Sequence, residues 1–338
     1  MQTIAKERKH TLDRIRELEK RVPRAIVRIE KKLVDFPFRK YFLGHQKPQR
    51  AKFKPNWREW PNDRLTLAWL GHSTVLINFY GTWILTDPVF VERVGIHVGP
   101  MTLGPRRLVH PPLHPKNLPP LDIVLLSHAH MDHTDLPSLR ALRNVKHAVV
   151  AANTKDVYRD LQFGSIDELD WQKSRVYSMG GGDVRVEAIE VRHAGWRMPW
   201  DSCRSRNEKN GRSYNAYLVQ KIGPDGLLHS FVFGGDTGYT PTFRTLGDRM
   251  RAEDHEIECA IMPIGTYNPW VEAHCNPEQA WRMTLEMNSH VIVPVHWNTF
   301  TQSSEPRYEP IEWLREIVDI PHSIALSEHG ETWQFLPD

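Results

Sequence analysis

Three histidines and one aspartate stand within six residues of each other, in the segment His128-x-His130-x-Asp132-His133. The segment directly follows the apolar run 123–126, which predicts a buried strand. Side chains two residues apart on extended backbone point the same way, so His128 and His130 are expected to project together. Neutral imidazole nitrogens and carboxylate oxygens suit zinc, manganese or iron. The alternative is a solvated histidine-rich loop, but such a loop does not usually end a buried strand.

Four more apolar runs, rich in β-branched residues, each lead directly into a residue that can bind a metal: Asp87, His193, Asp236 and His296. Taken singly, an aspartate at a strand end usually caps a turn, and a lone histidine is usually structural. Ligands at strand ends are, however, how a sheet builds a pocket along one edge. Together with the 128–133 cluster, the four residues favour one shared site.

The body of the chain alternates apolar runs with helix signals and contains no internal repeat, as is typical of an α/β protein. Residues 67–79 and 82–87 predict strand, turn and strand, because Tyr80-Gly81 separates two β-rich runs. Segments 95–121 and 195–213 show no clear period and predict two long loops. Long loops in compact domains are often functional.

Two helix starts are also predicted. Residues 135–143 read as a helix that begins immediately after the histidine cluster. Asn276-Pro277-Glu278-Gln279 has asparagine at the N-cap, proline at the first helical position and glutamine at the third.

The composition is that of a soluble globular protein, with 338 residues, 40% hydrophobic and 25% charged. No run of eighteen apolar residues predicts a membrane span, and the N-terminus lacks the apolar core of a signal peptide. The three cysteines are widely spaced and do not suggest a disulfide framework. We therefore expect a cytoplasmic protein.

The charge is unevenly distributed along the chain. Residues 1–60 hold 18 Lys and Arg against 7 Asp and Glu, a net charge of +11, whereas the remainder holds 26 against 34, a net charge of −8. Residues 4–33 have a helical apolar period, split at Pro23, and residues 36–62 read as an irregular connector. Such a basic amphipathic arm can lie on an anionic bilayer or pack on its own domain. The predicted organisation is a basic helical extension and connector, 1–60, and a hydrolase domain, 61–338.

The order of the candidate ligands resembles the metallo-β-lactamase superfamily. The flanking sequences are similar to the branch that contains N-acylphosphatidylethanolamine phospholipase D, to which the ascorbate-6-phosphate lactonases are related. The resemblance covers roughly residues 60–310. It is carried by six segments: Trp69-Leu-Gly-His-Ser-Thr-Val, Leu85-Thr-Asp-Pro, Gly104-Pro-Arg-Arg, Gly234-Gly-Asp-Thr-Gly-Tyr, Pro263-Ile-Gly-Thr-Tyr and Val295-His-Trp-Asn-Thr-Phe.

The resemblance implies an αβ/βα four-layer sandwich, the metallo-β-lactamase fold, with two divalent metal ions at the sheet edge. Zinc is favoured, and iron or manganese would accept the same ligands. By this analogy one ion is held by His128, His130 and His193, and the other by Asp132, His133 and His296. Asp236 would bridge the two ions, and Asp87 would orient ligands from behind them.

The resemblance also implies which residues meet the substrate. Asp132 and His274 are expected to take part in catalysis, and His274 precedes the predicted helix start at Asn276 as in the phospholipase branch. Substrate contacts are expected from His72, Arg106 and Tyr267. The stretch after His193 differs from the Ser-Gly-Arg type of sequence in that branch, which leaves the identity of the substrate open.

The predicted function is therefore a dinuclear metal-dependent hydrolase, a phosphodiesterase of phospholipase D type. It would attack a phospholipid-like substrate with a metal-bridging hydroxide. A lactonase or other carboxylic ester hydrolase of the same fold is the main alternative. A non-catalytic, metal-stabilised binding protein is disfavoured because every ligand position is filled. Nucleic acid is disfavoured as a partner by the acidic body. The basic arm predicts peripheral contact with an anionic membrane at its inner face.

Overall fold

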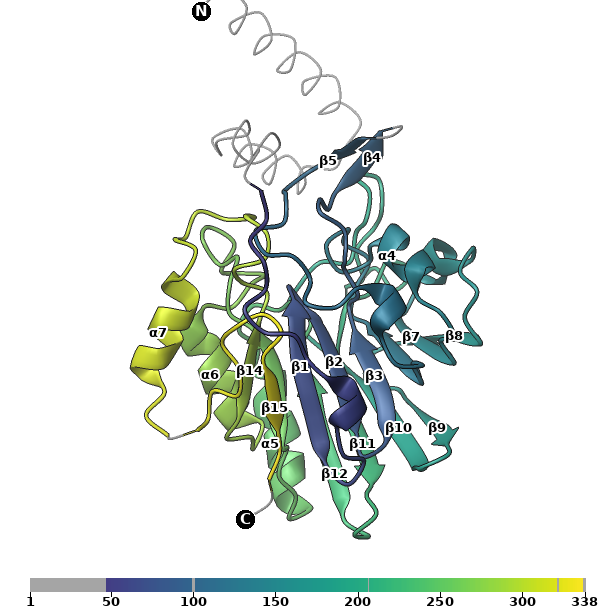
Figure 1. The fold of residues 1–338 in the computed structure, drawn as a ribbon, viewed down its shortest axis with the longest axis vertical. Coiled ribbons are helices and arrows are strands. Elements are labelled where there is room, and N and C mark those ends of the chain that lie inside the picture. The colour runs from purple at the N-terminus through teal and green to yellow at the C-terminus, as the bar shows by residue number, and fades with distance from the viewer. Residues whose placement is uncertain (1–46, 99–100, 206, 321, 337–338) are drawn as a thin grey trace, which may run out of the picture.

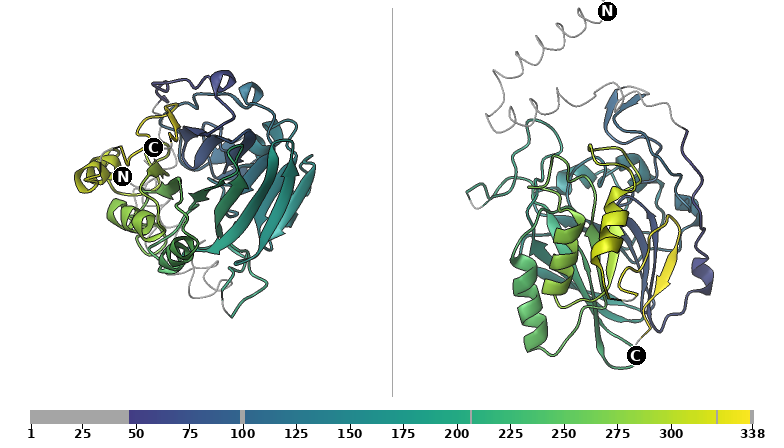
Figure 2. Two further views of the ribbon diagram at one scale, coloured as in Figure 1. Left: turned by 90° about the horizontal axis from the view of Figure 1, so that it is seen from below. Right: turned by 90° about the vertical axis from the view of Figure 1, so that its left-hand side faces the viewer.

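The computed structural model describes residues 47–98, 101–205, 207–320 and 322–336 (Figure 1). The predicted helices of the basic arm, within residues 1–46, lie outside the described residues. In the described part, two β-sheets pack face to face, and helices cover their outer faces (Figures 1 and 2). This is the predicted four-layer αβ/βα sandwich.

The first sheet has seven strands in the order β15-β1-β2-β3-β6-β7-β8. Its β15, β1, β2 and β3 are antiparallel, whereas β3, β6, β7 and β8 run parallel. The bounds are β1 (Leu65–Gly71), β2 (Thr74–Phe79), β3 (Thr82–Thr86), β6 (Ile123–Leu126), β7 (His147–Ala151), β8 (Ser165–Leu169) and β15 (Thr332–Gln334).

The second sheet has six strands in the order β14-β13-β12-β11-β10-β9. Strands β9 to β12 are antiparallel, and β12, β13 and β14 are parallel. The bounds are β9 (Ser174–Met179), β10 (Gly182–Glu190), β11 (Asn215–Ile222), β12 (Leu228–Phe233), β13 (Cys259–Pro263) and β14 (Ile292–Val295).

Four α-helices and three short 3-10 helices complete the described part of the chain. They are α4 (Leu136–Ala141), α5 (Thr242–Ala252), α6 (Pro277–Glu286), α7 (Glu309–Ile317), η1 (Trp57–Glu59), η2 (Pro115–Asn117) and η3 (Lys155–Tyr158). In the part that the structure describes, no helix is long and apolar enough to cross a membrane.

The largest core cluster fills the space between the sheets and extends beneath α5, α6 and α7. A second cluster lies on the outer face of the first sheet, under α4 and η3. Trp57 and Trp60 also pack there, and the buried Trp60 stacks on Trp83 with ring centroids 5.7 Å apart. The described end of the connector is therefore part of the packed body, while the domain boundary at residue 60 stays a prediction.

The single strand predicted over 67–79 is wrong, since the chain turns back on itself between β1 and β2. Gly71 adopts φ +111° and His72 adopts φ 54° at this turn. This φ at Gly71 lies where side chains cause strain, so the turn favours glycine. The turn brings His72 to the edge of the sheet that carries the other candidate residues.

The long loop predicted over 95–121 is also only partly right. It contains a two-stranded hairpin, β4 (Ile96–Val98) and β5 (Met101–Leu103), as well as η2. Each strand has only three residues, Ile96-His-Val and Met101-Thr-Leu, so its apolar–polar alternation is too short to predict a strand.

The two predicted helix starts are confirmed. Asp135 accepts a hydrogen bond from the backbone N–H of Ser138 at the start of α4. At α6, Asn276 and Gln279 form a reciprocal capping box with Pro277 in the first turn. These caps fix where each helix begins, and both starts lie directly after segments that carry candidate ligands.

Candidate metal centre

The candidate ligands converge on one end of the sandwich, where the carboxyl ends of several strands meet. Asp87 follows β3 and His128 follows β6 in the first sheet. Asp236 follows β12 and His296 follows β14 in the second sheet. Both sheets therefore contribute to one site, at the edge where open α/β sheets usually bind ligands.

A first set of three imidazoles meets within hydrogen-bonding distance. His128 Nε2 lies 2.8 Å from His130 Nδ1, and His193 Nε2 lies 3.2 Å from each of these atoms. Three ligand nitrogens on a tetrahedral zinc ion would stand about 3.3 Å apart, given zinc–nitrogen bonds of about 2.0–2.1 Å. The three nitrogens thus form nearly the face of a zinc coordination tetrahedron.

A second set lies beside the first. His133 Nε2 is 3.1 Å from His296 Nε2, and Asp132 Oδ2 is 3.5 Å and 3.6 Å from these two nitrogens. The same carboxylate oxygen is 3.0 Å from His72 Nε2. The structure therefore brings together the three residues predicted for a second ion.

Asp236 lies between the two sets. Its Oδ2 is 3.0 Å from His133 Nε2, 3.2 Å from His296 Nε2 and 3.9 Å from His193 Nε2. Its Oδ1 is buried and has no hydrogen-bond partner among the described residues. A buried carboxylate oxygen without a partner is costly unless a cation or a donor meets it. The donor set and this oxygen fit a bridging position between two divalent ions.

Most of the ring nitrogens that face away from the centre have hydrogen-bond partners, but His130 Nε2 is buried without one among the described residues. His133 Nδ1 donates to Asp87, His128 Nδ1 to Ser127 Oγ and His193 Nδ1 to the carbonyl of Ala273. With the rear nitrogen protonated, the front nitrogen of each ring offers a lone pair to a metal. Holding the tautomer in this way is the usual role of groups behind histidine ligands.

Asp87 is the buried anchor of this arrangement. Its Oδ1 accepts from the backbone N–H of Ser127 at 2.8 Å, and its Oδ2 accepts from Ser127 Oγ at 2.5 Å and from His133 Nδ1 at 2.6 Å. The carboxylate touches one candidate ligand directly and reaches His128 through Ser127. This is the placement expected for a residue that orients ligands from behind.

Burial keeps the first histidine set neutral. It lowers the pKa of His128 well below its usual range and the pKa of His130 to about 3. Burial also lowers the pKa of His193, against the opposing effect of Asp236. Neutral imidazole is the form that binds a metal, so this set needs to lose no proton on binding.

The second set behaves differently because two carboxylates face it. Burial disfavours charge on His296, but Asp236 and Asp132 outweigh it and raise the pKa to about 9. The same two carboxylates raise the pKa of His133. Protons and metal ions would compete for these two rings, so metal binding here releases protons.

Several residues around the centre have left-handed backbone conformations that non-glycine residues rarely adopt. The φ angles are 54° for His72, 29° for Asp87, 66° for Thr266 and 63° for His296. Such conformations persist only where the surroundings hold them, and they gather at functional sites. Four of them at one sheet edge indicate a site whose geometry is set by the whole fold.

His274 lies beside the candidate ligands, and its part in catalysis stays a prediction. Its Nδ1 is 3.6 Å from Asp236 Oδ2 and has no hydrogen-bond partner among the described residues, and its ring is 5.0 Å from that of His193. The side chain retains 13% exposure, so it lies at the boundary between the buried ligands and the solvent.

The three residues predicted to contact substrate are placed differently. His72 is 1% exposed and directs Nε2 at Asp132, which suits a role in holding that carboxylate. Tyr267 donates its hydroxyl to Glu309 of α7 at 2.5 Å. Arg106 pairs with Glu92 at 3.0 Å. For these three residues, substrate contact stays a prediction.

Sequence reasoning missed two residues at the centre. Ser127, which links Asp87 to His128, directly precedes the first histidine, and that adjacency was the only signal. Gln302 donates from Nε2 to Asp132 Oδ2 at 2.6 Å. It lies in a polar stretch with no apolar run before it, and nothing in the local sequence marks it.

Comparison with known proteins identifies what the chain is similar to. Residues 82–297 match the family model described as "Beta-lactamase superfamily domain". An uncharacterized protein of Mycobacterium tuberculosis is 34% identical over 290 residues, 82% of this chain and 70% of its own length. The N-acyl-phosphatidylethanolamine-hydrolyzing phospholipase D 1 of Caenorhabditis elegans is 27% identical over 288 residues, 80% of this chain and 76% of its own length.

Solved structures share the fold. The isothiocyanate hydrolase from Delia radicum gut bacteria superposes with a TM-score of 0.60 at 17% identity, covering 80% of this chain and 99% of that one. At this identity the likeness concerns the arrangement of the sheets and helices alone.

Proposed function

The chain belongs to the beta-lactamase superfamily domain family and is a metal-dependent hydrolase, and we propose that it is a dinuclear phosphodiesterase of phospholipase D type. The observation that carries the two-metal part is the position of Asp236 Oδ2, within 4 Å of His133, His296 and His193. One carboxylate oxygen that reaches both ligand sets suits two ions about 3.5–4 Å apart.

Two divalent ions bound here would supply an activated water and positive charge for the attacked and leaving oxygens. His128, His130 and His193 would hold one ion, and Asp132, His133 and His296 the other. Zinc is the favoured metal, while iron and manganese accept the same nitrogen and oxygen donors.

The chain's own residues would position the substrate and handle its protons. Asp132 is held by His72 and Gln302, both of which donate to Oδ2, so its orientation is fixed before substrate arrives. The His274 ring stands at the partly exposed rim, with a nitrogen that no described residue engages. We assign it contact with the charge that develops on the substrate during the reaction.

A phospholipid-like phosphodiester is the substrate class we favour. The Caenorhabditis elegans relative, named for hydrolysing N-acyl-phosphatidylethanolamine, and the basic arm of net charge +11 over residues 1–60 both support this choice. A lactonase or other carboxylic ester hydrolase is the second candidate, because the same centre can serve attack on phosphorus or on a carbonyl carbon.

The deciding experiment compares two substrates with zinc-reconstituted protein. N-acylphosphatidylethanolamine in mixed micelles and a simple lactone are assayed side by side. Release of phosphatidic acid supports the phosphodiesterase, whereas lactone opening alone moves the protein to the second candidate. His130→Ala should abolish both bound metal and turnover. His290→Ala, at an exposed histidine outside the centre, is the matched control.

We further propose that the basic arm gives a cytoplasmic protein peripheral contact with an anionic membrane. In the full chain, Lys31, Lys32, Arg39 and Lys40 are replaced together by glutamine. Residues 47–60 are left intact because Trp60 packs on Trp83. Co-sedimentation with phosphatidylserine vesicles should fall at least tenfold. Unchanged binding would overturn this part of the proposal without touching the hydrolase assignment.

A further inference from the structure

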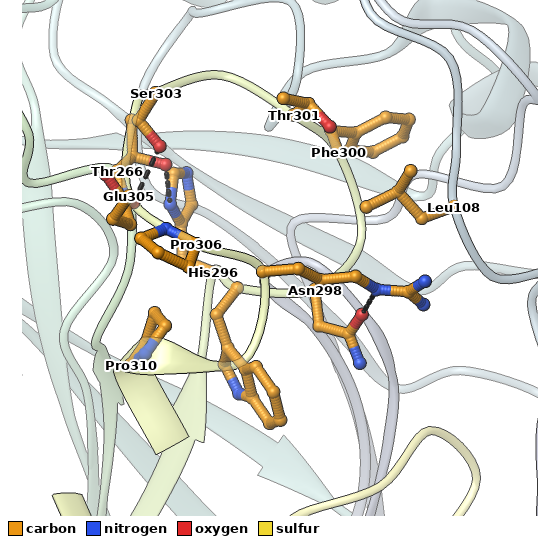
Figure 3. A pocket seen from close by; sticks show the side chains of 12 residues that line it. Leu108, Thr266, His296, Asn298, Phe300, Thr301, Ser303, Glu305, Pro306 and Pro310 are labelled. Atoms are coloured by element: carbon orange, nitrogen blue, oxygen red, sulfur yellow. Dashed lines mark hydrogen bonds between the residues drawn. The ribbon is translucent and has the colours of Figure 1, made fainter. Parts of the chain in front are cut away.

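The carboxylate of Glu305 lies behind His296 and is not one of the candidate metal ligands described above. Thr266 connects the two: its hydroxyl is 3.2 Å from His296 Nδ1, and its backbone N–H donates to Glu305 Oε1 at 2.5 Å (Figure 3). The three residues line a recess of about 80 Å³.

Glu305 joins two loops that come from different strands. Its Oε1 also accepts from Ser303 Oγ at 2.6 Å, and its Oε2 accepts from the backbone N–H of Asn268 at 3.2 Å. Thr266 and Asn268 follow β13, whereas Ser303 and Glu305 follow β14. The carboxylate thus fixes the loop after β13 against the segment that begins with His296.

The backbone at these positions requires such a restraint. Thr266 adopts φ 66°, an unfavourable conformation for a β-branched residue, and His296 adopts φ 63°. Gly265 packs so closely that a side chain there would meet the carbonyl oxygen of His296 at 2.5 Å. The two loops are therefore in tight contact, and a bound carboxylate is what holds the Thr266 N–H in place.

We propose that Glu305, acting through Thr266, is a positioning residue for His296. The Thr266 hydroxyl accepts the proton of His296 Nδ1, which leaves the Nε2 lone pair facing Asp132 and His133. Glu305 in turn fixes the Thr266 backbone, so that this hydroxyl stays in place. The inference rests on the proposed two-metal centre, and it assigns Glu305 to the metal set of Asp132, His133 and His296 alone.

Glu305 is expected to affect only one of the two metal sites, because its hydrogen bonds connect it to only one ligand set. The rear nitrogens of His128 and His193 bind Ser127 and the carbonyl of Ala273, which do not bond to Glu305 or Thr266. Loss of the Glu305 carboxylate should therefore weaken one of the two metal sites and leave the other intact. Replacement of groups behind metal ligands typically changes metal affinity about 10–100-fold.

The test is zinc binding to metal-depleted full-length protein, followed by competition with a chelator. Wild type should show two binding steps. Glu305→Gln and Thr266→Val should each weaken one step about 10–100-fold and leave the other within about twofold. Thr266→Ser, which keeps the hydroxyl, should restore the weakened step to near the wild-type affinity.

Glu309→Gln is the matched control, because Glu309 binds the neighbouring Tyr267 hydroxyl but makes no bond to Thr266. Equal loss in Glu309→Gln and Glu305→Gln would reduce the effect to general loosening of the loop and overturn the inference. So would two unchanged steps, or two equally weakened steps, in Glu305→Gln. A wild-type protein that binds fewer than two zinc ions overturns the proposed function and this inference together.

Discussion

Asp87 Oδ2 lies 2.6 Å from His133 Nδ1, and both side chains are completely buried. The two residues are 46 positions apart and come from the ends of β3 and β6, which pair in parallel. The Asp87 carboxylate accepts hydrogen bonds from three donors: the backbone N–H and the Oγ of Ser127, and His133 Nδ1. This buried side chain after β3 therefore fixes the orientation of a candidate ligand that follows the neighbouring strand β6.

Asp87→Asn is expected to reduce zinc content without unfolding the protein. The amide has the same size, but its NH₂ group would face a donor from His133 or Ser127. We expect a 10–100-fold loss of zinc affinity. Bound zinc per chain after dialysis is the measurement, and Asp63→Asn, at an exposed aspartate, is the control. Wild-type zinc content in Asp87→Asn would contradict the role of Asp87.

Removal of metal should lower the free energy of unfolding. A ligand present at 1,000 times its dissociation constant stabilises the folded state by about 4 kcal/mol if it binds only that state. Thermal unfolding of the zinc-loaded protein should therefore shift to lower temperature when a chelator is added. His130→Ala should show no further shift with chelator. An identical melting curve for wild type with and without chelator would argue against a buried metal centre.

Arg197, on the 195–213 loop, is expected to stabilise the segment 128–134, which carries four of the candidate ligands. Its Nη1 donates to the carbonyls of Ala129 and Thr134, at 2.9 Å and 2.8 Å, on either side of the Asp132-His133 turn. Arg197→Met leaves these carbonyls unpaired and should cost about 1–3 kcal/mol in urea unfolding.

Arg251→Met is the control at the surface. Arg251 pairs with Asp248 three residues before it on α5, and the two side chains are 45% and 68% exposed, so its loss should cost less than about 1 kcal/mol. If both variants lose the same stability, the bonds from Arg197 to the two carbonyls have no special importance.

At acid pH, protonation of Asp201 should destabilise the 195–213 loop. Burial raises the pKa of this carboxyl, but backbone N–H donors from Met198 and Arg197, together with Arg212, outweigh it and leave the pKa lowered. A lowered carboxyl pKa adds stability above the unfolded value, about 3.9, and this stability is lost as the pH falls through the folded value. The protection factors of the loop amides against hydrogen exchange should fall below about pH 4. Asp201→Asn should exchange rapidly even at neutral pH; slow exchange there would refute this explanation.

The convergence of the candidate ligands could be predicted from the sequence because most of them obey a local rule. Asp87, His128, Asp236 and His296 each follow an apolar strand, and the carboxyl ends of such strands meet in the fold. The helix starts at Asp135 and Asn276 were predictable for the same reason, since a cap is decided by neighbouring residues.

The supporting residues were not predictable because their partners are distant in sequence. Glu305 and Thr266 are 39 residues apart, and Gln302 and Asp132 are 170 apart. The turn at Gly71 falls within the segment 67–79, where the polar residues His72-Ser-Thr were predicted to continue one strand, and the pairing of β1 with β2 reveals it. Tertiary contact, rather than pattern, decides these features.

The division of the ligands between two sheets has a consequence for how the protein matures during synthesis. Six strands of the first sheet, β1, β2, β3, β6, β7 and β8, leave the ribosome before those of the second, and the segments after them carry only part of the centre. Neither proposed ligand set is complete until the second sheet has docked, because His193 belongs to one set and His296 to the other. Cation capture would thus come after sheet docking, and a nascent chain stalled before β14 would lack His296 and could complete only the set of His128, His130 and His193.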